Sequence, residues 1–325
     1  MVLHIHNGDA TADVAKQSPI PGEHFAWREA LIEGPTPGNV TGTEWRRRRA
    51  QHLANAYKVE LEESEQELLK QEEKLESSSD YDEVVLWFEH DLFCQINMIY
   101  LLYRFSRQEL GQTRLSLVCI NSFAGKENFR GLGELNADEL ASLFPAREQV
   151  TPEQLDLSRR AWAAYSSPDP RDVQTLIQTD NSALPFLSAA LKAHLRRFPS
   201  TRNGLGLIEN RGLQFIGSGP KRFQDLFSNF SEAEPIYGLG DAQFWLSLQR
   251  LTEANQPLLR RNGGNTPPDA TFEMTALGEA VLKGKGDFVL LNGIDRWLGG
   301  VYLSDERNLW RWDEASERVV LTRNN

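Results

Sequence analysis

The sequence predicts an α/β domain with a small, Rossmann-like parallel sheet, followed by a helical segment and by a winged-helix-like α+β domain. Residues 84–88, VVLWF, form an apolar strand without a polar face, as in a parallel strand that helices cover on both sides. An apolar run of helical length and a second strand at residues 115–120 follow it, which is the order of a βαβ unit. Farther along, three short helical segments precede two probable strands and the sequence TALGEAVL, as in a winged helix.

We expect three regions along the chain. Residues 1–130 form the α/β domain, into which a long charged helical segment is inserted at residues 44–80, as one solvated helix or as a helical hairpin. Residues 131–198 contain no convincing strand and form a helical connector, which includes a helix that begins at the capping residue Thr151. Residues 199–325 form the winged-helix-like domain, with wing strands at 257–260 and 271–274, and end in a small β meander.

The composition is that of a soluble globular protein, since 40% of the 325 residues are hydrophobic and 25% are charged. No apolar run approaches the roughly 18 residues that would suggest a membrane span. The N-terminal MVLHIHNGD is typical of a strand and not of a signal peptide. Cys94 and Cys119 lie inside apolar runs, which favours reduced core thiols. We therefore expect a cytoplasmic protein that does not contact a membrane.

The net charge of −11 is concentrated in one segment, because residues 58–83 hold 11 acidic residues and 3 lysines. Such a segment is usually a solvated helix face. The four arginines of WRRRR (45–49) would point in several directions on a helix. We therefore expect them to pair with these acids rather than to form an anion site.

Polar residues follow each predicted strand of the α/β domain. Ligands of open α/β sheets bind at the carboxyl ends of the strands, so we expect these residues to converge on one site. Glu89, His90 and Asp91 are the candidate catalytic residues, and Asp9 and Glu89 are the candidate ligands of a divalent cation such as Mg²⁺. The candidates for ligand binding are His6, Asn7, Gly8, Asp9, Asn121 and Ser122.

Several of these residues have structural alternatives. Asp91 also suits the N-cap of the helix that follows it, and Asp9 or Thr11 suits the cap of the first helix. Gly8 suits a turn that needs positive φ. These roles do not exclude a function, so both interpretations stay open for each residue.

Glu89 is the residue that a structural role explains least well. A carboxylate that closes an apolar strand is costly unless it is paired or solvated. An ion pair with Arg28 or Arg46 would satisfy it. His4 and His6 alternate on one strand, so one of them can be a hydrogen-bonded core histidine.

The winged-helix-like region is only mildly basic. Residues 192–264 contain 10 lysines and arginines and 6 acidic residues, whereas duplex binding normally needs several phosphate contacts from basic side chains. The presumed recognition helix, GDAQFWLSLQRL, is dominated by Phe244, Trp245 and Leu248. A structural or protein-contact role is favoured over DNA binding.

Three motifs, HIHNGD, WREALIEGPTP and LWFEHDLFCQINMIYLL, together resemble a bacterial family whose N-terminal domain is catalogued as domain of unknown function 1835. The C-terminal runs GLGDAQFW, LTEANQPLL and NGIDRWLGGVYL resemble the second half of such proteins. Cys94 departs from the pattern, since a polar residue is more usual after EHDLF. The resemblance implies the two-part layout, and it implies no catalytic residue.

These observations lead to two hypotheses from different classes. The first is a protein that binds a small polar ligand, a phosphate-containing compound or a nucleotide, at the strand ends of the α/β domain, compatible with metal-assisted hydrolysis or group transfer. The alternative is a regulatory or adaptor protein without catalysis, whose winged-helix-like domain contacts DNA or a protein partner. The sequence does not identify the ligand or the oligomeric state.

Overall fold

The computed structural model describes residues 1–217, 219–264, 269–304 and 308–323. Its N-terminal half is built on a mixed five-stranded sheet with the order β2-β1-β3-β4-β5. The strands are β1 (Val2–Asn7), β2 (Glu23–Trp27), β3 (Glu83–Glu89), β4 (Arg114–Ile120) and β5 (Glu148–Gln149). The first four are parallel, and the short β5 is antiparallel to β4. The predicted α/β architecture is therefore confirmed, with an antiparallel edge strand added inside the connector.

Helices cover both faces of this sheet, which explains why β3 has no polar face. The helix α4 (Leu92–Phe105) packs on the face that contains Leu3, Ile5 and Leu86, as part of the main core. The helices α1 (Asp9–Lys16) and α5 (Ala137–Leu143) lie on the other face, where Val85 and Trp87 are buried. All seven residues of β3 are buried, including the glutamates at both ends.

The long charged helical segment predicted at residues 44–80 is two helices that pack against each other, α2 (Gly42–Tyr57) and α3 (Leu61–Glu76), followed by the turn η1 (Ser77–Asp80). The chain reverses at Lys58, whose φ of 58° is left-handed and ends α2. Of the arginines of α2, Arg46 binds Glu72 in the acidic segment, as predicted. Arg48 binds Glu44 and the buried Arg49 binds Glu29, and both of these acids lie outside that segment.

The connector is helical, as predicted. It contains η2 (Leu132–Glu134), α5, η3 (Phe144–Ala146), α6 (Pro152–Tyr165), α7 (Arg171–Ile177) and α8 (Leu187–Leu195). Thr151 caps α6 in a capping box with Gln154, and Pro152 occupies the first turn.

The C-terminal half contains α9 (Leu207–Ile216), α10 (Phe223–Ala233), η4 (Pro235–Tyr237) and α11 (Asp241–Thr252), which pack against a three-stranded sheet. That sheet has the order β6-β8-β7, from β6 (Lys221–Arg222), β7 (Leu259–Gly263) and β8 (Ala270–Met274). Phe223, Phe230, Phe244 and Phe272 are almost completely buried between the helices and this sheet. These elements agree with the predicted helices and with the two strands predicted at residues 257–260 and 271–274.

The predicted C-terminal meander is two separate hairpins, preceded by α12 (Ala276–Leu282) and α13 (Phe288–Asn292). One hairpin is β9 (Arg296–Leu298) with β10 (Val301–Leu303), and the other is β11 (Asn308–Asp313) with β12 (Arg318–Arg323). The two pairs do not form one sheet. They pack on the connector. α7 contacts β12, and the backbone N–H of Gly300, in the β9–β10 turn, donates to the carbonyl oxygen of Tyr165 at the end of α6.

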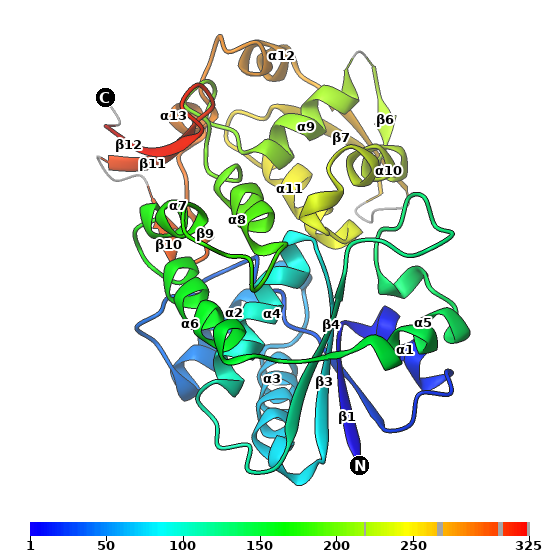
Figure 1. The fold of residues 1–325 in the computed structure, drawn as a ribbon. Coiled ribbons are helices and arrows are strands. Elements are labelled where there is room, and N and C mark those ends of the chain that lie inside the picture. The colour runs from blue at the N-terminus through cyan, green and yellow to red at the C-terminus, as the bar shows by residue number, and fades with distance from the viewer. Residues whose placement is uncertain (218, 265–268, 305–307, 324–325) are drawn as a thin grey trace.

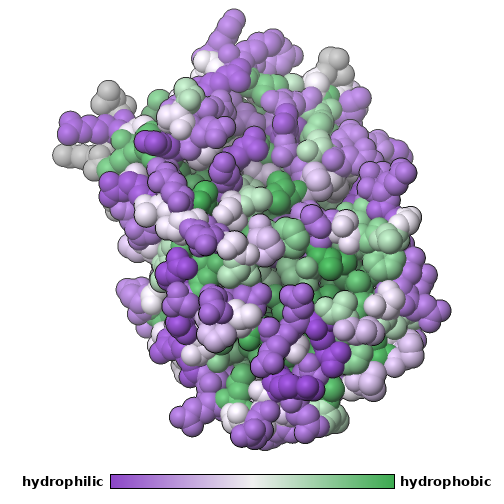
Figure 2. Space-filling view, in the orientation of Figure 1, coloured by the Kyte–Doolittle hydropathy of each residue, from purple (hydrophilic) through white to green (hydrophobic). Residues whose placement is uncertain are grey.

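The two halves share one hydrophobic core that runs from Leu3 to Val319. In Figure 1 the carboxyl edge of the five-stranded sheet points toward the helices of the C-terminal half. Side chains connect the halves directly: Gln243 Nε2 on α11 donates to Tyr57 Oη at 2.7 Å. Figure 2 shows polar residues over both ends of one face and apolar residues gathered near its middle. None of the helices in the described ranges is long and apolar enough to span a membrane.

Candidate functional site

The carboxyl end of β3 and the first turn of α4 bring three titratable side chains together. One ligand atom from each of Glu89, Asp91 and Cys94 lies within 4.8 Å of the others. The three side chains, which we call the strand-end cluster, are only 6%, 5% and 4% exposed. β3 delivers Glu89, Asp91 is the N-cap of α4, and Cys94 follows three residues later.

Hydrogen bonds fix every member of the strand-end cluster. Glu89 Oε1 accepts from the backbone N of Leu132 at 2.6 Å, and Cys94 Sγ donates to Glu89 Oε2 at 2.6 Å. Asp91 Oδ1 accepts from the backbone N of Cys94 at 2.8 Å, which confirms the predicted capping role. Asn7 Nδ2, from the end of β1, donates to Cys94 Sγ at 2.9 Å.

Burial controls the ionisation of the cluster. Burial, with a smaller contribution from the nearby Asp91 carboxylate, raises the pKa of Glu89 to about 7. Burial also raises the pKa of Asp91, and burial with both carboxylates raises the pKa of the Cys94 thiol well above its usual value. Near neutral pH, Glu89 therefore exchanges a proton within a closed, negatively charged pocket.

The donor set has a definite preference among cations. Two carboxylates and one thiol are three protein ligands, and a thiol ligand favours zinc or another soft cation over Mg²⁺. The Mg²⁺ hypothesis from the sequence, in which Asp9 joins Glu89, does not fit this arrangement. A single ion is the largest species for which the side chains are arranged.

Two glycine segments close the cluster from outside. A Cβ added at Gly131 would lie 3.1 Å from Glu89 Oε1. At Gly238, where φ is 59°, an added Cβ would overlap the Asp91 carboxylate. Because Gly238 follows η4, the C-terminal half seals the carboxyl end of β3, and this cluster presents no open face to a substrate.

Asp9, the other predicted metal ligand, lies outside the cluster. Its carboxylate accepts two hydrogen bonds from Arg28 Nε and one from Nη2, at 2.8–3.0 Å, and Arg28 also binds Glu67. These hydrogen bonds lower the pKa of Asp9. Arg28 is thus used by Asp9 and not by Glu89. The prediction that Asp9 or Thr11 caps α1 is wrong. The N-cap is Gly8, and no side chain forms a capping hydrogen bond at this helix end.

The predicted histidines point away from the cluster. His6 Nε2 lies 3.0 Å from His24 Nδ1 on the opposite face of the sheet, beside His4 and Trp87. His4 is a buried core histidine whose Nδ1 accepts from Trp87 Nε1 at 3.1 Å. His90 packs edge-on against Phe186, and its Nδ1 has no partner within the described part of the chain.

The remaining predicted residues occupy the rim. Gly8 has φ of 92°, as its predicted turn requires, and its N–H bonds to the carbonyl oxygens of His6 and Trp27. Asn121 and Ser122 are exposed at the end of β4 and bond to each other. Of the nine predicted residues, the structure brings Glu89, Asp91 and Asn7 together. It adds Cys94, whose position three residues after the capping Asp91 was the available signal.

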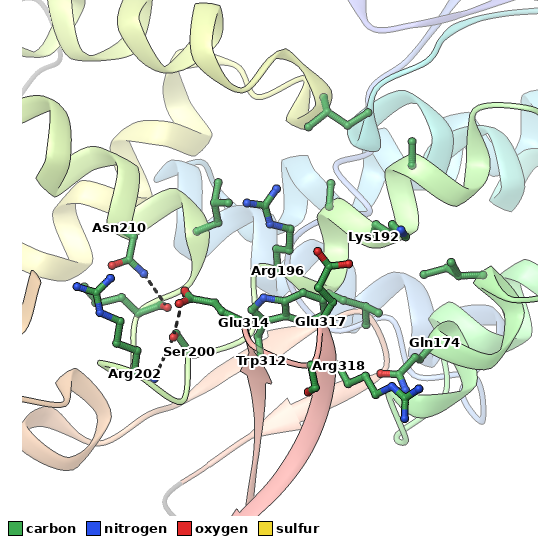
Figure 3. Close-up of a pocket in the computed structure, with 18 of the residues that line it drawn as sticks. Gln174, Lys192, Arg196, Ser200, Arg202, Asn210, Trp312, Glu314, Glu317 and Arg318 are labelled. Carbon is green, nitrogen blue, oxygen red and sulfur yellow. Dashed lines mark hydrogen bonds between the residues drawn. The ribbon is translucent and has the colours of Figure 1, made fainter. Parts of the chain in front are cut away.

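The largest cavity that we describe lies elsewhere, between α7, α8, α9 and the hairpin β11–β12 (Figure 3). This connector cavity has a volume of about 1060 Å³, close to the upper end of the range for small-molecule sites. Its charged lining residues are Lys192, Arg196, Arg202, Arg211, Glu314, Glu317 and Arg318, five cations against two anions. Sequence reasoning missed it, because the lining comes from segments more than 140 residues apart.

Three of these cations have no partner. The side chains of Lys192, Arg196 and Arg318 make no hydrogen bond or ion pair with any residue that the structure describes. By contrast, Arg211 binds Glu234, and Arg202 Nη2 donates to the carbonyl of Leu282 at 3.2 Å.

Polar groups and an indole complete the lining. Figure 3 shows Ser200 bonded to Glu314, at 3.3 Å, and Asn210 on the left of the view, with Trp312 in the middle. Gln174 lies on the far side, where its Oε1 accepts from the backbone N of Val319.

Comparisons with known proteins add little to this description. No family model matches the chain, and no curated protein matches it. Among solved structures, the chain is similar to a chain in the structure of Drosophila ORC bound to DNA, with 14% identity over 87% of this chain and 80% of that chain. The TM-score of 0.21 is too low to indicate a shared fold.

Proposed function

We propose that the protein binds a small, phosphate-containing ligand, and that the ligand occupies the connector cavity. The observation that carries the proposal is the set of unpaired cations, Lys192, Arg196 and Arg318, around a cavity of about 1060 Å³. The ligand class is the one expected from the sequence. The location differs, because the strand-end cluster is closed by Gly131 and Gly238.

The charges of the cavity suit a phosphate group. Guanidinium groups bind phosphate oxygens through two parallel hydrogen bonds, and lysine adds a point charge. Arg196 and Lys192 lie on one side of the cavity, and Arg318 lies across it beside Gln174 (Figure 3). The side chains of Gln178, Ser188 and Asn210 supply polar groups that could orient the rest of the ligand.

The test is a calorimetric titration of the protein with pairs of compounds that differ by one phosphate, such as a nucleoside and its monophosphate. We expect binding of the phosphorylated member alone. Arg196→Ala and Arg318→Ala should each weaken it at least about tenfold, because a hydrogen bond to a charged group contributes roughly 1.5–3 kcal/mol.

Arg47→Ala is the matched control, since Arg47 is an exposed cation of α2 without a partner in the described structure. Unchanged affinity in the Arg196 and Arg318 variants would reject the proposal. An equal loss in the control would show binding by net charge alone.

The alternative hypothesis concerns the C-terminal half. We propose that α9, α10 and α11 with β6-β8-β7 form a winged-helix-like unit, in which α11 takes the place of the recognition helix. Gln243 on α11 donates to Tyr57 of α2, and Arg250 on α11 pairs with Glu209. Because α11 faces the N-terminal half, its role here is an intramolecular contact. We expect no binding to duplex DNA even at low salt, where phosphate contacts are strongest, and saturable binding in a titration would contradict this.

Membership of the domain of unknown function 1835 family is part of the same proposal. It is supported by the motifs HIHNGD and LWFEHDLFCQINMIYLL, which form β1 with its turn and β3 with α4. A purified homologue with these motifs should bind the same phosphorylated compound with similar affinity. A homologue that has these motifs but binds none of the compounds would show that the motifs do not predict the ligand.

A further inference from the structure

A second cavity lies at the junction of the two halves of the molecule. It has a volume of about 450 Å³. The segment after β2 and the C-terminal part of α2 line one side, with Gly34, His52 and Lys58. The other side is lined by Arg197 after α8, Arg250 of α11 and Arg296 at the start of β9. We call it the junction cavity.

Arg197 is the residue that makes this cavity unusual. Its side chain is only 3% exposed, and its Nη1 donates to the backbone carbonyl of Ile32 at 2.7 Å. Its Nε is buried and has no hydrogen-bond partner among the described residues. The described chain also gives Arg197 no carboxylate partner. A buried guanidinium without a carboxylate partner is costly, because one backbone carbonyl replaces only part of the water that it has lost.

The two other arginines share a single carboxylate. Arg250 Nη1 and Arg296 Nη1 both donate to Oε1 of Glu209, at 3.2 and 2.8 Å. Glu209 is 3% exposed, and its Oε2 is buried without a partner. Two guanidinium groups therefore share one buried carboxylate, and Arg197 adds a third positive charge near it.

The acids that line the junction cavity, Glu33, Glu253 and Asp295, stand against four cations, Lys58, Arg197, Arg250 and Arg296, and each of the three accepts a hydrogen bond from a neutral donor. Tyr57 donates to Glu33 Oε2 at 2.7 Å, and Gln249 Nε2 donates to Glu253 Oε1 at 2.7 Å. Tyr302 donates to Asp295 Oδ1 at 3.0 Å.

The arginines repel one another, and this repulsion adds to the effect of burial on their pKa values. Burial and then Arg296 lower the pKa of Arg250 to about 10. Burial and then Arg296 also lower the pKa of Arg197. Burial, Arg49 and Arg250 lower the pKa of His52 to about 3, so its ring is neutral. An anion in the cavity would reverse each of these effects.

We propose that the junction cavity is a binding site for one compact oxyanion, either inorganic phosphate or the terminal phosphate of a small organic ligand. The anion pairs with Arg197, Arg250 and Lys58 and supplies the acceptor that Arg197 Nε lacks among the described residues. It lies between residues of both halves, and its binding therefore stabilises their contact. This site is separate from the connector cavity, since the two share no lining residue.

The experiment measures the melting temperature and the binding isotherm of the full chain with inorganic phosphate, against chloride at equal ionic strength. We expect saturable phosphate binding at one site and a concentration-dependent rise in melting temperature. Arg250→Gln should weaken the binding at least about tenfold, and Lys58→Gln, at an exposed position that tolerates change, about threefold. Arg260→Gln, another exposed arginine of the C-terminal half, is the matched control and should bind as wild type does.

Several outcomes would overturn the proposal. They are the absence of saturable binding by the wild-type protein, and wild-type affinity in both the Arg250 and Lys58 variants. Phosphate binding that is lost in Arg196→Ala but kept in Arg250→Gln would belong to the connector cavity instead. A second titration with a phosphorylated organic compound decides between the two sources of the anion: competition with phosphate at the same stoichiometry indicates the terminal phosphate, and no competition indicates the free ion.

Discussion

Glu89→Gln should stabilise the protein, and it should do so only where wild-type Glu89 is ionised. Burial and the adjacent Asp91 raise the pKa of Glu89 from 4.5 to about 7 in the folded protein. The proton is held more tightly in the folded state, so the contribution of Glu89 to stability is fully present below pH 4.5. It is lost as the pH rises toward 7 and stays lost above that value. A glutamine remains neutral throughout and keeps the acceptor for Leu132.

The magnitude follows from the two pKa values. Each unit of difference corresponds to about 1.4 kcal/mol, so ionised Glu89 costs the folded protein about 3 kcal/mol. Buried histidines act in the opposite direction in the same pH window, because burial lowers the pKa of His4 to about 4 and that of His52 to about 3. The pH dependence of the wild-type free energy of unfolding therefore does not isolate the contribution of Glu89. The difference in free energy of unfolding between the variant and the wild type does isolate it, since both proteins contain the same histidines and their contributions cancel.

The assay is chemical unfolding of both proteins at pH 5 and pH 8. We expect the free energy of unfolding of Glu89→Gln, relative to wild type, to rise by about 2–3 kcal/mol between these pH values. Glu83→Gln, at the other buried end of β3, is the control. Hydrogen bonds from Arg147 and Ser116 outweigh its burial and lower the pKa of Glu83, so this variant should be less stable than wild type at both pH values. An offset for Glu89→Gln that does not change with pH would refute the reasoning.

Two further predictions concern the contact between the halves. Gly238→Ala should lower stability by about 2–4 kcal/mol, because its φ of 59° is left-handed and the new Cβ would overlap Asp91; Gly125→Ala, with positive φ but nothing within 4 Å, should cost only about 1 kcal/mol in the same thermal unfolding assay. A double-mutant cycle of Tyr57→Phe and Gln243→Ala should give a coupling free energy of about 1 kcal/mol through their hydrogen bond. Strictly additive effects would show that α11 does not hold α2 in solution.

Some features of the candidate site followed from short stretches of sequence. The apolar run at 84–88 predicted a strand buried on both faces, and Asp91 was predicted to cap the next helix. Gly8 was predicted to take positive φ. These predictions succeeded because each depends on backbone geometry within a few consecutive residues.

Other features depended on residues that are distant in sequence. An ion pair of Glu89 with Arg28 or Arg46 was one alternative, but Arg28 binds Asp9 and Glu67 and Arg46 binds Glu72. The charged segment at 44–80, for which one helix and a helical hairpin were both open, reverses at Lys58, where α3 packs back on α2. No local pattern shows which of several carboxylates an arginine reaches, since both side chains are long and the choice depends on where their backbones lie.

The sequence by itself therefore determined the elements of this protein: the parallel strands, the caps, the turns and the polar residues at the strand ends. Hydrophobic periodicity and capping hydrogen bonds act over a few residues, so they can be identified without a structure. The tertiary structure alone decided which of those residues meet. It closed the strand-end cluster with Gly238, 147 residues beyond Asp91, and it gathered Arg197, Arg250 and Arg296 from three separate segments around one cavity. Such sites are set by the packing of whole elements, and the energy of that packing is spread over the core and not over any local stretch.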